Sequence, residues 1–160
     1  MDLDVHENFM DYFLFLKLKD TMNAGHFPWF KSLFVKETDD IQLVHTFYEF
    51  DKVNYEFFEL LEPCLRLLNI ERLLRVKANL VLRTPEIKEH GFHIDNQTYK
   101  KFKTAILYIN TNDGYTRFEK KNKKIKSEEN KLIDFNGRLS HTGTSCTDAP
   151  YRMVINFVYY

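Results

Sequence analysis

The sequence predicts a mostly β protein, an antiparallel barrel or jelly roll, supported by helices from its N-terminal part. Two observations support this prediction. After residue 70, short runs rich in β-branched and aromatic residues recur, separated by turns at Pro85, Asn112-Asp113-Gly114 and Asn136-Gly137. Before residue 70, apolar residues recur at helical spacing instead.

The helical part is expected to contain two segments. In the first, Phe9, Phe13 and Leu16 share one helical face. The face of the second comprises Tyr55, Phe58, Leu61, Leu65 and Leu68. Pro63 falls inside the second segment, so we expect an irregular helix there, because proline donates no backbone hydrogen bond.

The predicted strands are short. They comprise residues 42–50, 75–83, 102–110, 115–119, 131–135 and 151–160. His26 to Trp29 has the composition of a loop. Lys120 to Lys131 alternates lysines with acidic and amide residues, which indicates a solvated hairpin loop rather than a nucleic-acid site. Residues 1–74 are thus expected to be a helical support region, and residues 75–160 the β core.

Length and composition exclude several classes of protein. The 160 residues suffice for a single domain, residues 1–160, with a sizeable core. The 23 basic and 23 acidic residues balance, so no overall charge directs the chain to nucleic acid or to an anionic membrane. Two cysteines are too few for a disulfide framework, and Tyr12 to Leu18 is too short to span a membrane. We expect a cytoplasmic protein without a signal peptide, and make no prediction of its oligomeric state.

The last predicted strand carries a charge on an otherwise largely apolar run. Arg152 shares one face with Val154 and Asn156, and the opposite face is apolar. A guanidinium in such a place needs an anion, supplied either by a structural salt bridge or by a ligand. By the same alternation, Tyr108 in the strand 102–110 would point its hydroxyl into the barrel.

His93, Asp95 and His141 are candidate metal ligands. Two positions apart on a strand, His93 and Asp95 project from one face, and His141 follows the turn at Gly137. Each would then lie at a strand end, where a barrel opens. Two imidazoles and one carboxylate suit a borderline divalent ion such as iron and leave three octahedral positions open.

Other interpretations of the same region stay open. A histidine beside an aspartate is often only a surface pair. His90 could join His141 in a zinc site, and a zinc-dependent hydrolase could use Glu89 to activate water. Cys146 could be a nucleophile, although a small loop residue explains it more simply. Lys77, Asn79 and Arg83 either line a pocket or, for the two cations, mark the solvated ends of a strand.

From residue 75 onward, the sequence carries an ordered series of motifs: His93-Ile94-Asp95, TAILYIN at 104–110, GYTRF at 114–118, DFNG at 134–137, His141 and YRMVINF at 151–157. With this series, the sequence resembles the Fe(II)/2-oxoglutarate-dependent dioxygenases. Within them it is most similar to the prolyl 4-hydroxylase-like branch, which includes small stand-alone members of bacteria and phages. The resemblance rests on an ordered series of motifs rather than on any one of them.

The resemblance implies a double-stranded β-helix, a cupin-like jelly roll with the N-terminal helices packed on one sheet. It implies Fe(II) held by His93, Asp95 and His141, and 2-oxoglutarate held at its distal carboxylate by Arg152, with Tyr108 and Asn156 assisting. O2 would be consumed, with ascorbate as a candidate reductant.

The implied reaction is hydroxylation of a C–H bond of a peptide or small molecule, with release of succinate and CO2. For a phage-encoded chain the implied location is the cytoplasm of a bacterial host. The alternative left open is a non-catalytic cupin-like metal-binding or structural module. Metal identity and turnover of 2-oxoglutarate distinguish these hypotheses from each other and from the zinc hydrolase.

Overall fold

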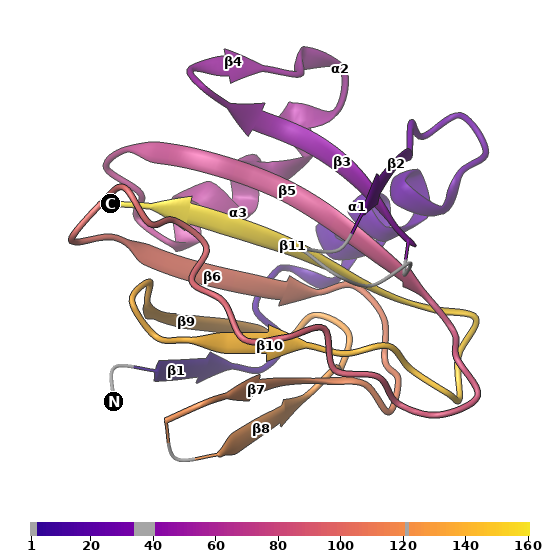
Figure 1. Ribbon diagram of the computed structural model, residues 1–160. Helices are drawn as coiled ribbons and strands as arrows, with labels where there is room; N and C mark the ends of the chain where they lie inside the picture. Colours follow the sequence, from indigo (N-terminus) through magenta and orange to yellow (C-terminus); the bar gives the residue numbers. More distant parts are fainter. Residues whose placement is uncertain (1–2, 34–40, 121) are drawn as a thin grey trace.

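A computed structural model describes residues 3–33, 41–120 and 122–160 (Figure 1). These residues form an eight-stranded sheet, a three-stranded sheet and several short helices. The strands are β1 (Leu3–His6), β2 (Phe30–Leu33), β3 (Ile41–Glu49), β4 (Lys52–Val53), β5 (Leu73–Leu82), β6 (Lys103–Tyr108), β7 (Tyr115–Phe118), β8 (Lys123–Lys126), β9 (Leu132–Asn136), β10 (His141–Gly143) and β11 (Tyr151–Tyr159). The helices are α1 (Tyr12–Asn23), α2 (Tyr55–Phe58), the 3₁₀ helix η1 (Glu59–Leu61) and α3 (Glu62–Leu67).

The two sheets are stacked, as in a jelly roll. In the large sheet the strand order is β1-β9-β6-β11-β5-β3-β2, with β4 paired to β3, and in the small sheet it is β10-β7-β8. All the pairings described are antiparallel. A core cluster between the sheets joins side chains from β6, β9 and β11 to Phe118 of β7 and Ile125 of β8. The mostly β jelly roll predicted from the sequence is therefore confirmed.

Strand β11 lies in the middle of the large sheet, hydrogen-bonded to β5 on one side and β6 on the other. Its side chains alternate as the sequence predicts, so that Arg152, Val154 and Asn156 face a cavity. The opposite face of β11 and β5 packs toward the helices and comprises Met153, Ile155, Phe157, Val76, Ala78 and Leu80. This alternation presents polar residues on the cavity face of two neighbouring strands.

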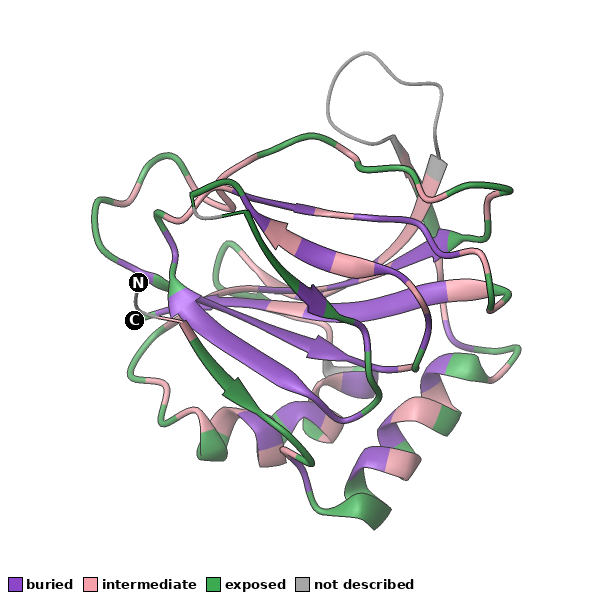
Figure 2. Cartoon of the chain, turned by 90° about the horizontal axis from the view of Figure 1, so that it is seen from below, coloured by how far each residue is buried: buried purple, intermediate pink, exposed green. Residues whose placement is uncertain are grey.

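The helices lie along the other face of the large sheet (Figure 2). Their buried side chains include Phe15, Leu18 and Met22 of α1, Leu61 of η1 and Cys64 of α3. Within the part of the chain that the structure describes, no helix has the length and apolar character needed to cross a membrane. The helices thus stiffen the large sheet and leave its cavity face open.

The first helix buries a different face from the one predicted. The side chain of Asp11 accepts hydrogen bonds from the backbone N–H groups of Phe13 and Leu14, so the helix begins after Phe9. Phe13 is 79% exposed, whereas Phe15 is fully buried. The predicted face was wrong because the cap, which fixes where the helix starts, also fixes which side chains point at the sheet.

The irregular second helix is confirmed. The predicted segment is divided into α2, η1 and α3, and Pro63 lies in the first turn of α3, where its missing N–H costs least. The side chain of Tyr55, which was part of this prediction, lies outside the described structure.

Two assignments of the remaining chain need correction. Residues 1–74 contain more strands than predicted: β3 confirms the predicted strand 42–50, but β1, β2 and β4 also lie in this region and join the large sheet. Lys120 to Lys131 is not only a loop, because it contains β8, which pairs with β7. Lys121 lies outside the described residues. The strands that were missed, β1, β2, β4 and β8, are only two to four residues long, so their local sequence pattern is weak.

Phe15→Ala is expected to lower the free energy of unfolding by about 3–5 kcal/mol, because it opens a cavity beneath α1 in the core. Phe13→Ala, the matched control on the same helix, should change it by less than about 0.5 kcal/mol, because that ring is exposed. Urea denaturation of both variants measures the difference. A larger loss for Phe13→Ala than for Phe15→Ala would mean that α1 packs with the face first predicted.

Candidate active site

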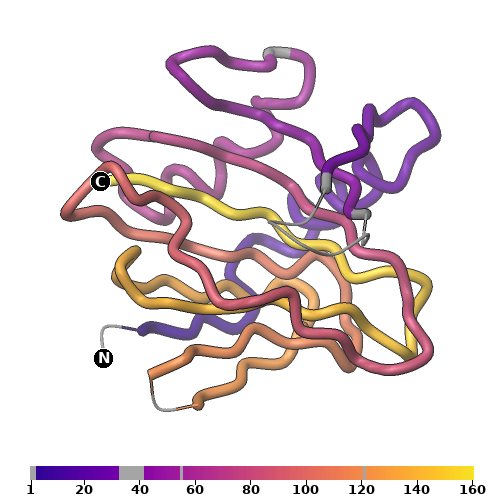
Figure 3. Tube along the Cα trace, viewed as in Figure 1, coloured from indigo at the N-terminus to yellow at the C-terminus, as the bar shows by residue number. Residues whose placement is uncertain are grey.

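The segment between β5 and β6 is irregular and crosses the front of the molecule (Figures 1 and 3). An isolated antiparallel bridge joins its residue His93 to His141 of β10. The backbone N–H of His93 donates to the carbonyl of His141 at 2.9 Å, and the reverse bond measures 3.0 Å. The prediction that His93 and Asp95 lie on a strand was wrong, because the segment contacts β10 through single bridges rather than a continuous ladder.

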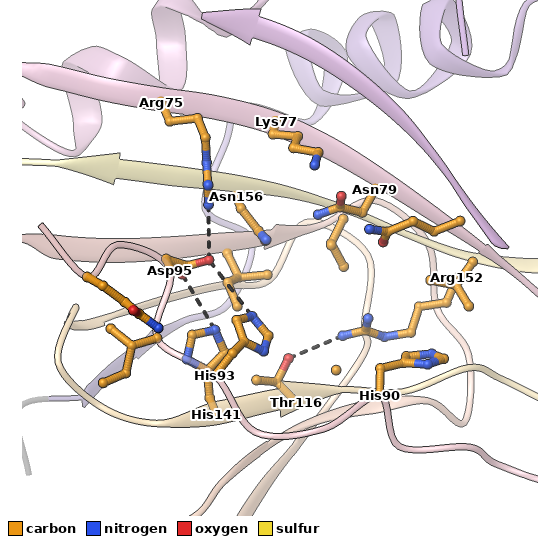
Figure 4. Close-up of a pocket in the computed structure, with 17 residues that line it drawn as sticks. Arg75, Lys77, Asn79, His90, His93, Asp95, Thr116, His141, Arg152 and Asn156 are labelled. Atoms are coloured by element: carbon orange, nitrogen blue, oxygen red, sulfur yellow. Dashed lines mark hydrogen bonds and ion pairs between the residues drawn. The ribbon is translucent and has the colours of Figure 1, made fainter. Parts of the chain in front are cut away.

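The side chains of His93, Asp95 and His141 nevertheless converge at one end of a cavity (Figure 4). Their ligand atoms all lie within 4.8 Å of one another. Nε2 of His141 is 3.5 Å from Oδ2 of Asp95, and Nε2 of His93 is 4.0 Å from Oδ1. Among the described residues, no other cluster of histidine, cysteine, aspartate and glutamate side chains is so arranged.

Backbone carbonyls orient both imidazoles. Nδ1 of His141 lies 2.9 Å from the carbonyl of Leu139, and Nδ1 of His93 lies 3.3 Å from that of Gly91. Because a carbonyl oxygen can only accept, each Nδ1 carries the proton, and each Nε2 keeps a lone pair directed toward Asp95. This is the tautomer that metal ligation through Nε2 requires.

Asp95 is ionised although it is buried. Burial raises the pKa of Asp95, but attraction by His141 and His93 in their protonated forms and by Arg75 outweighs burial and holds that pKa below its ordinary value. Nη2 of Arg75, on β5, donates to Oδ1 at 3.1 Å, while the buried Oδ2 makes no hydrogen bond with any residue that the structure describes. A buried carboxylate oxygen without a hydrogen bond, beside two imidazole lone pairs, fits a divalent cation such as Fe(II).

At the other end of the cavity, of about 410 Å³, lies Arg152. Its side chain is buried, and its Nε donates to Oγ of Ser127 at 2.7 Å and its Nη2 to Oγ1 of Thr116 at 3.2 Å. No carboxylate of the described residues pairs with it, so the salt-bridge alternative does not apply within them. Burial lowers the pKa of Arg152, yet a guanidinium stays charged at neutral pH.

The surroundings of Arg152 are shaped for its side chain. A Cβ added at Gly114 would lie 2.7 Å from Cδ of Arg152, so any larger residue there would displace the arginine. Hydroxyl groups do not neutralise the charge of this buried guanidinium. The site therefore favours binding of an anionic ligand.

Tyr108 lies behind Arg152, in the core between the sheets. Its hydroxyl donates to Oγ1 of Thr116 at 2.8 Å, and Cζ of Arg152 lies 5.6 Å from its ring centroid. Burial raises the pKa of Tyr108 to about 12, so the hydroxyl remains a donor. Because Oγ1 of Thr116 accepts from both Tyr108 and Arg152, the threonine keeps its own hydrogen for a group in the cavity.

Asn156 lines the cavity near Lys77 and Asp95 rather than beside Arg152 (Figure 4). Its amide makes no hydrogen bond to any described residue, and its Oδ1 is buried. The tyrosine and the asparagine predicted to assist Arg152 therefore lie at different places, one behind the arginine and one toward the triad.

The structure separates the remaining candidates. His90 lines the cavity beside Arg152, away from the triad, so it does not form a zinc site with His141 (Figure 4). Glu89 accepts hydrogen bonds from Arg117 and from the Tyr115 hydroxyl, and the bond from Arg117 lowers the pKa of Glu89. An ion-paired carboxylate outside the triad is poorly placed to activate a metal-bound water.

Of the three polar residues considered for strand β5, two reach the cavity. Lys77 and Asn79 line it, whereas Arg83 lies beyond the end of the strand and is exposed. Arg75 and Thr116 also line the cavity, and neither was singled out from the sequence. The alternation of Arg75 with Lys77 and Asn79 was the available signal for the arginine.

Neither cysteine is expected to react with iodoacetamide in the folded protein. Burial raises the pKa of the Cys64 thiol to about 12 and also raises that of Cys146, whose thiol donates to the carbonyl of Ala149 at 3.4 Å. Because the thiolate is the reactive form, both should be alkylated only after unfolding, which mass spectrometry with and without denaturant measures. Rapid labelling of native Cys146 would restore the nucleophile hypothesis.

No protein-family model matches the sequence, and no curated protein matches it. Solved structures, in contrast, match this chain in fold. An oxidoreductase of the 2OG-Fe(II) oxygenase family from Burkholderia pseudomallei matches with a TM-score of 0.77 at 11% identity, over 99% of this chain and 85% of that one. The chain has the 2OG-Fe(II) oxygenase fold.

Two prolyl hydroxylases have the same fold. The enzyme from Trichoplax adhaerens, solved with a peptide fragment of hypoxia inducible factor, matches with a TM-score of 0.73 at 15% identity, over 99% of this chain and 83% of that one. The viral collagen prolyl hydroxylase from Paramecium Bursaria Chlorella virus-1, solved as a 2OG complex, matches with a TM-score of 0.65 at 14% identity, over 99% and 96%. The fold implied by the sequence resemblance, a 2OG-Fe(II) oxygenase jelly roll with helices on one sheet, is confirmed.

Proposed function

We propose that this protein is an Fe(II)- and 2-oxoglutarate-dependent oxygenase that hydroxylates a C–H bond of a peptide or small molecule, releasing succinate and CO2. The observation that carries the proposal is one cavity with a His-Asp-His triad at one end and Arg152 at the other. The triad suits a redox-active divalent metal, and the arginine suits a carboxylate of the cosubstrate. The oxygenase fold supports the same reaction class.

His93, Asp95 and His141 would hold the metal through two Nε2 atoms and one carboxylate oxygen. Bound Fe(II), with 2-oxoglutarate and O2, supplies the oxidising power for C–H hydroxylation. The chain's own contribution is to fix the ligands. The carbonyls of Leu139 and Gly91 set the imidazole tautomers, and Arg75 keeps Asp95 ionised and in place. Contacts of this kind are worth about 10- to 100-fold in metal affinity.

Arg152 would bind the distal carboxylate of 2-oxoglutarate, and the free hydroxyl hydrogen of Thr116 would donate to the same group. Tyr108 would act through Thr116, because its hydroxyl already donates to Oγ1 of that residue. Asn156 is four residues from Arg152 along β11, on the order of 13 Å at strand spacing. We therefore assign Asn156 to the end of the pocket near the metal, and not to the carboxylate that Arg152 holds.

A peptide substrate is supported by the Trichoplax prolyl hydroxylase, which was solved with a bound peptide fragment. The half-exposed His93 leaves the metal end of the cavity accessible from outside, as a peptide or a small molecule would need. Substrate C–H bonds would then approach the triad from the side of the irregular segment between β5 and β6.

Succinate formation from 2-oxoglutarate tests the proposal directly. Protein purified without oxygen is supplied with Fe(II), ascorbate and air, and succinate is quantified. Turnover, even without an added substrate, is the expected result. A second measurement is the visible absorbance band that 2-oxoglutarate produces when it chelates Fe(II). Loss of both signals would favour the non-catalytic cupin-like module, and tight binding of Zn(II) with hydrolytic activity would favour the zinc hydrolase.

A further inference from the structure

Strand β5 presents a row of polar side chains to the cavity. Arg75, Lys77 and Asn79 alternate along it with the core residues Val76 and Ala78. Lys77 is the cross-strand neighbour of Asn156 on β11, and both side chains line the cavity. Asn156 extends toward Asp95, and the amine of Lys77 points toward Asn79 (Figure 4). A lysine and an amide therefore occupy neighbouring positions on the large-sheet wall of the cavity.

Lys77 is a half-buried cation without a direct partner in the described part of the chain. It makes no hydrogen bond or ion pair to any described residue, whereas its neighbour Arg75 is bound to Asp95 at 3.1 Å. Two carboxylates, Glu49 on the adjacent strand β3 and Asp95, attract Lys77 only at a distance. Burial and the nearby Arg75 lower the pKa of Lys77, so the charged amine is held at some cost.

The charges that line the cavity do not balance. Arg75, Lys77 and Arg152 are cations, and Asp95 is the sole carboxylate among the described lining residues. Fe(II) and the 2-oxoglutarate dianion would offset each other in charge, and Arg152 would hold the distal carboxylate. Positive charge would therefore remain around Lys77, in a place too buried for full hydration, where a further anion is favoured.

We propose that Lys77 and Asn156 form a subsite for a carboxylate group of the substrate, which makes this protein selective for acidic substrates. The inference rests on the proposed function, since it concerns the compound to be hydroxylated. The ammonium would form a charge-assisted hydrogen bond to one carboxylate oxygen, and the Asn156 amide would donate to the other. This pairing orients a C–H bond of an acidic residue or acidic small molecule beside the triad.

The test uses protein loaded with Fe(II) and saturating 2-oxoglutarate without oxygen. Propionate and its isosteric amide, propionamide, are titrated in, and the Fe(II)/2-oxoglutarate band reports binding near the metal. We expect propionate to perturb the band at concentrations at least about tenfold lower than propionamide, as one charge-assisted hydrogen bond would give. Methyl phosphate, titrated in parallel, should bind less tightly than propionate; tighter binding would make the subsite a phosphate site and overturn the carboxylate assignment.

Variants assign the effect to Lys77. Lys77→Met should weaken propionate binding by about 10- to 100-fold, whereas Lys77→Arg, which keeps the charge, should largely retain it. Lys103→Met is the matched control, because Lys103 pairs with Asp134 outside the cavity. Propionate binding that Lys77→Met leaves unchanged would overturn the subsite, since the probe would then be ligating the metal alone.

The subsite and the proposed function fail in different ways. If the parent protein forms no Fe(II)/2-oxoglutarate band, the proposed function is wrong and the subsite falls with it. If the band forms normally but propionate and propionamide act alike, only the subsite is wrong. If Lys77→Met raises the concentration of 2-oxoglutarate needed to form the band, Lys77 belongs to the cosubstrate site, and the inference is equally overturned.

Discussion

Asp95→Ala is expected to reduce succinate formation from 2-oxoglutarate by at least about 100-fold, because it deletes a proposed metal ligand rather than a residue that only orients one. Asp95 is the one carboxylate among the described residues that line the cavity. Without it, two neutral imidazoles remain, and a divalent ion loses its anionic ligand. The band of the Fe(II)/2-oxoglutarate complex should weaken in parallel with turnover.

The matched control is Glu89→Gln. Glu89 lies on the same irregular segment and carries the same charge, but it is bound to Arg117 and Tyr115 outside the triad. This variant should retain the band and most of the turnover. Thermal unfolding of both variants separates a lost ligand from a lost fold. A folded Asp95→Ala protein that consumed 2-oxoglutarate like the parent would show that the metal ligands are wrongly assigned.

The strands that carry the cavity could be predicted because both of their faces have a strong local pattern. In β11, Arg152 and Asn156 alternate with side chains that pack under the helices, and β5 shows the same alternation. Such a pattern depends only on neighbouring residues, so it is present in the sequence before any tertiary contact forms.

The elements that were missed depend on contacts between distant parts of the chain. Strand β1 pairs with β9, from the opposite end of the chain, and only that partner makes four residues into a strand. In β8, three of four residues are lysines and only Ile125 is buried, so the sequence resembles a solvated loop. Local propensity is too weak to identify such strands.

In the proposed site too, local features could be predicted from the sequence, and contacts between distant segments could not. The residue types of the triad could be predicted from their chemistry and order, but the bridge between His93 and His141 that brings them together could not. Thr116 and Ser127 hold Arg152 from β7 and from the loop after β8. Hydroxyl residues are common in every sequence, so their role is visible only once the two sheets are stacked.

Arg152→Met is expected to raise the 2-oxoglutarate concentration needed for half-maximal turnover on the order of 100-fold. Removing one partner of a buried charged pair costs about 2–5 kcal/mol, and in the proposed complex that partner would be the distal carboxylate of the cosubstrate. Fe(II) binding should survive, because Arg152 lies at the other end of the cavity from the triad. Turnover measured against 2-oxoglutarate concentration, at fixed Fe(II), gives the effect.

The unfolding temperature of Arg152→Met distinguishes a ligand-binding arginine from a structural one. Replacing a structural arginine would lower this temperature, whereas replacing a ligand-binding arginine would not. In the protein without ligands, Arg152 is a buried cation whose side-chain partners among the described residues are neutral hydroxyls, those of Ser127, Thr116 and Tyr108. An apolar side chain of similar length should therefore keep or raise the unfolding temperature. Adding Fe(II) and 2-oxoglutarate should then stabilise the parent much more than Arg152→Met, because binding to the folded state adds to its stability. Arg66→Met, which removes an exposed arginine paired with Glu62, should respond to the ligands like the parent. If Arg152→Met instead unfolds early and gains as much stability from 2-oxoglutarate as the parent does, Arg152 serves the fold rather than the cosubstrate.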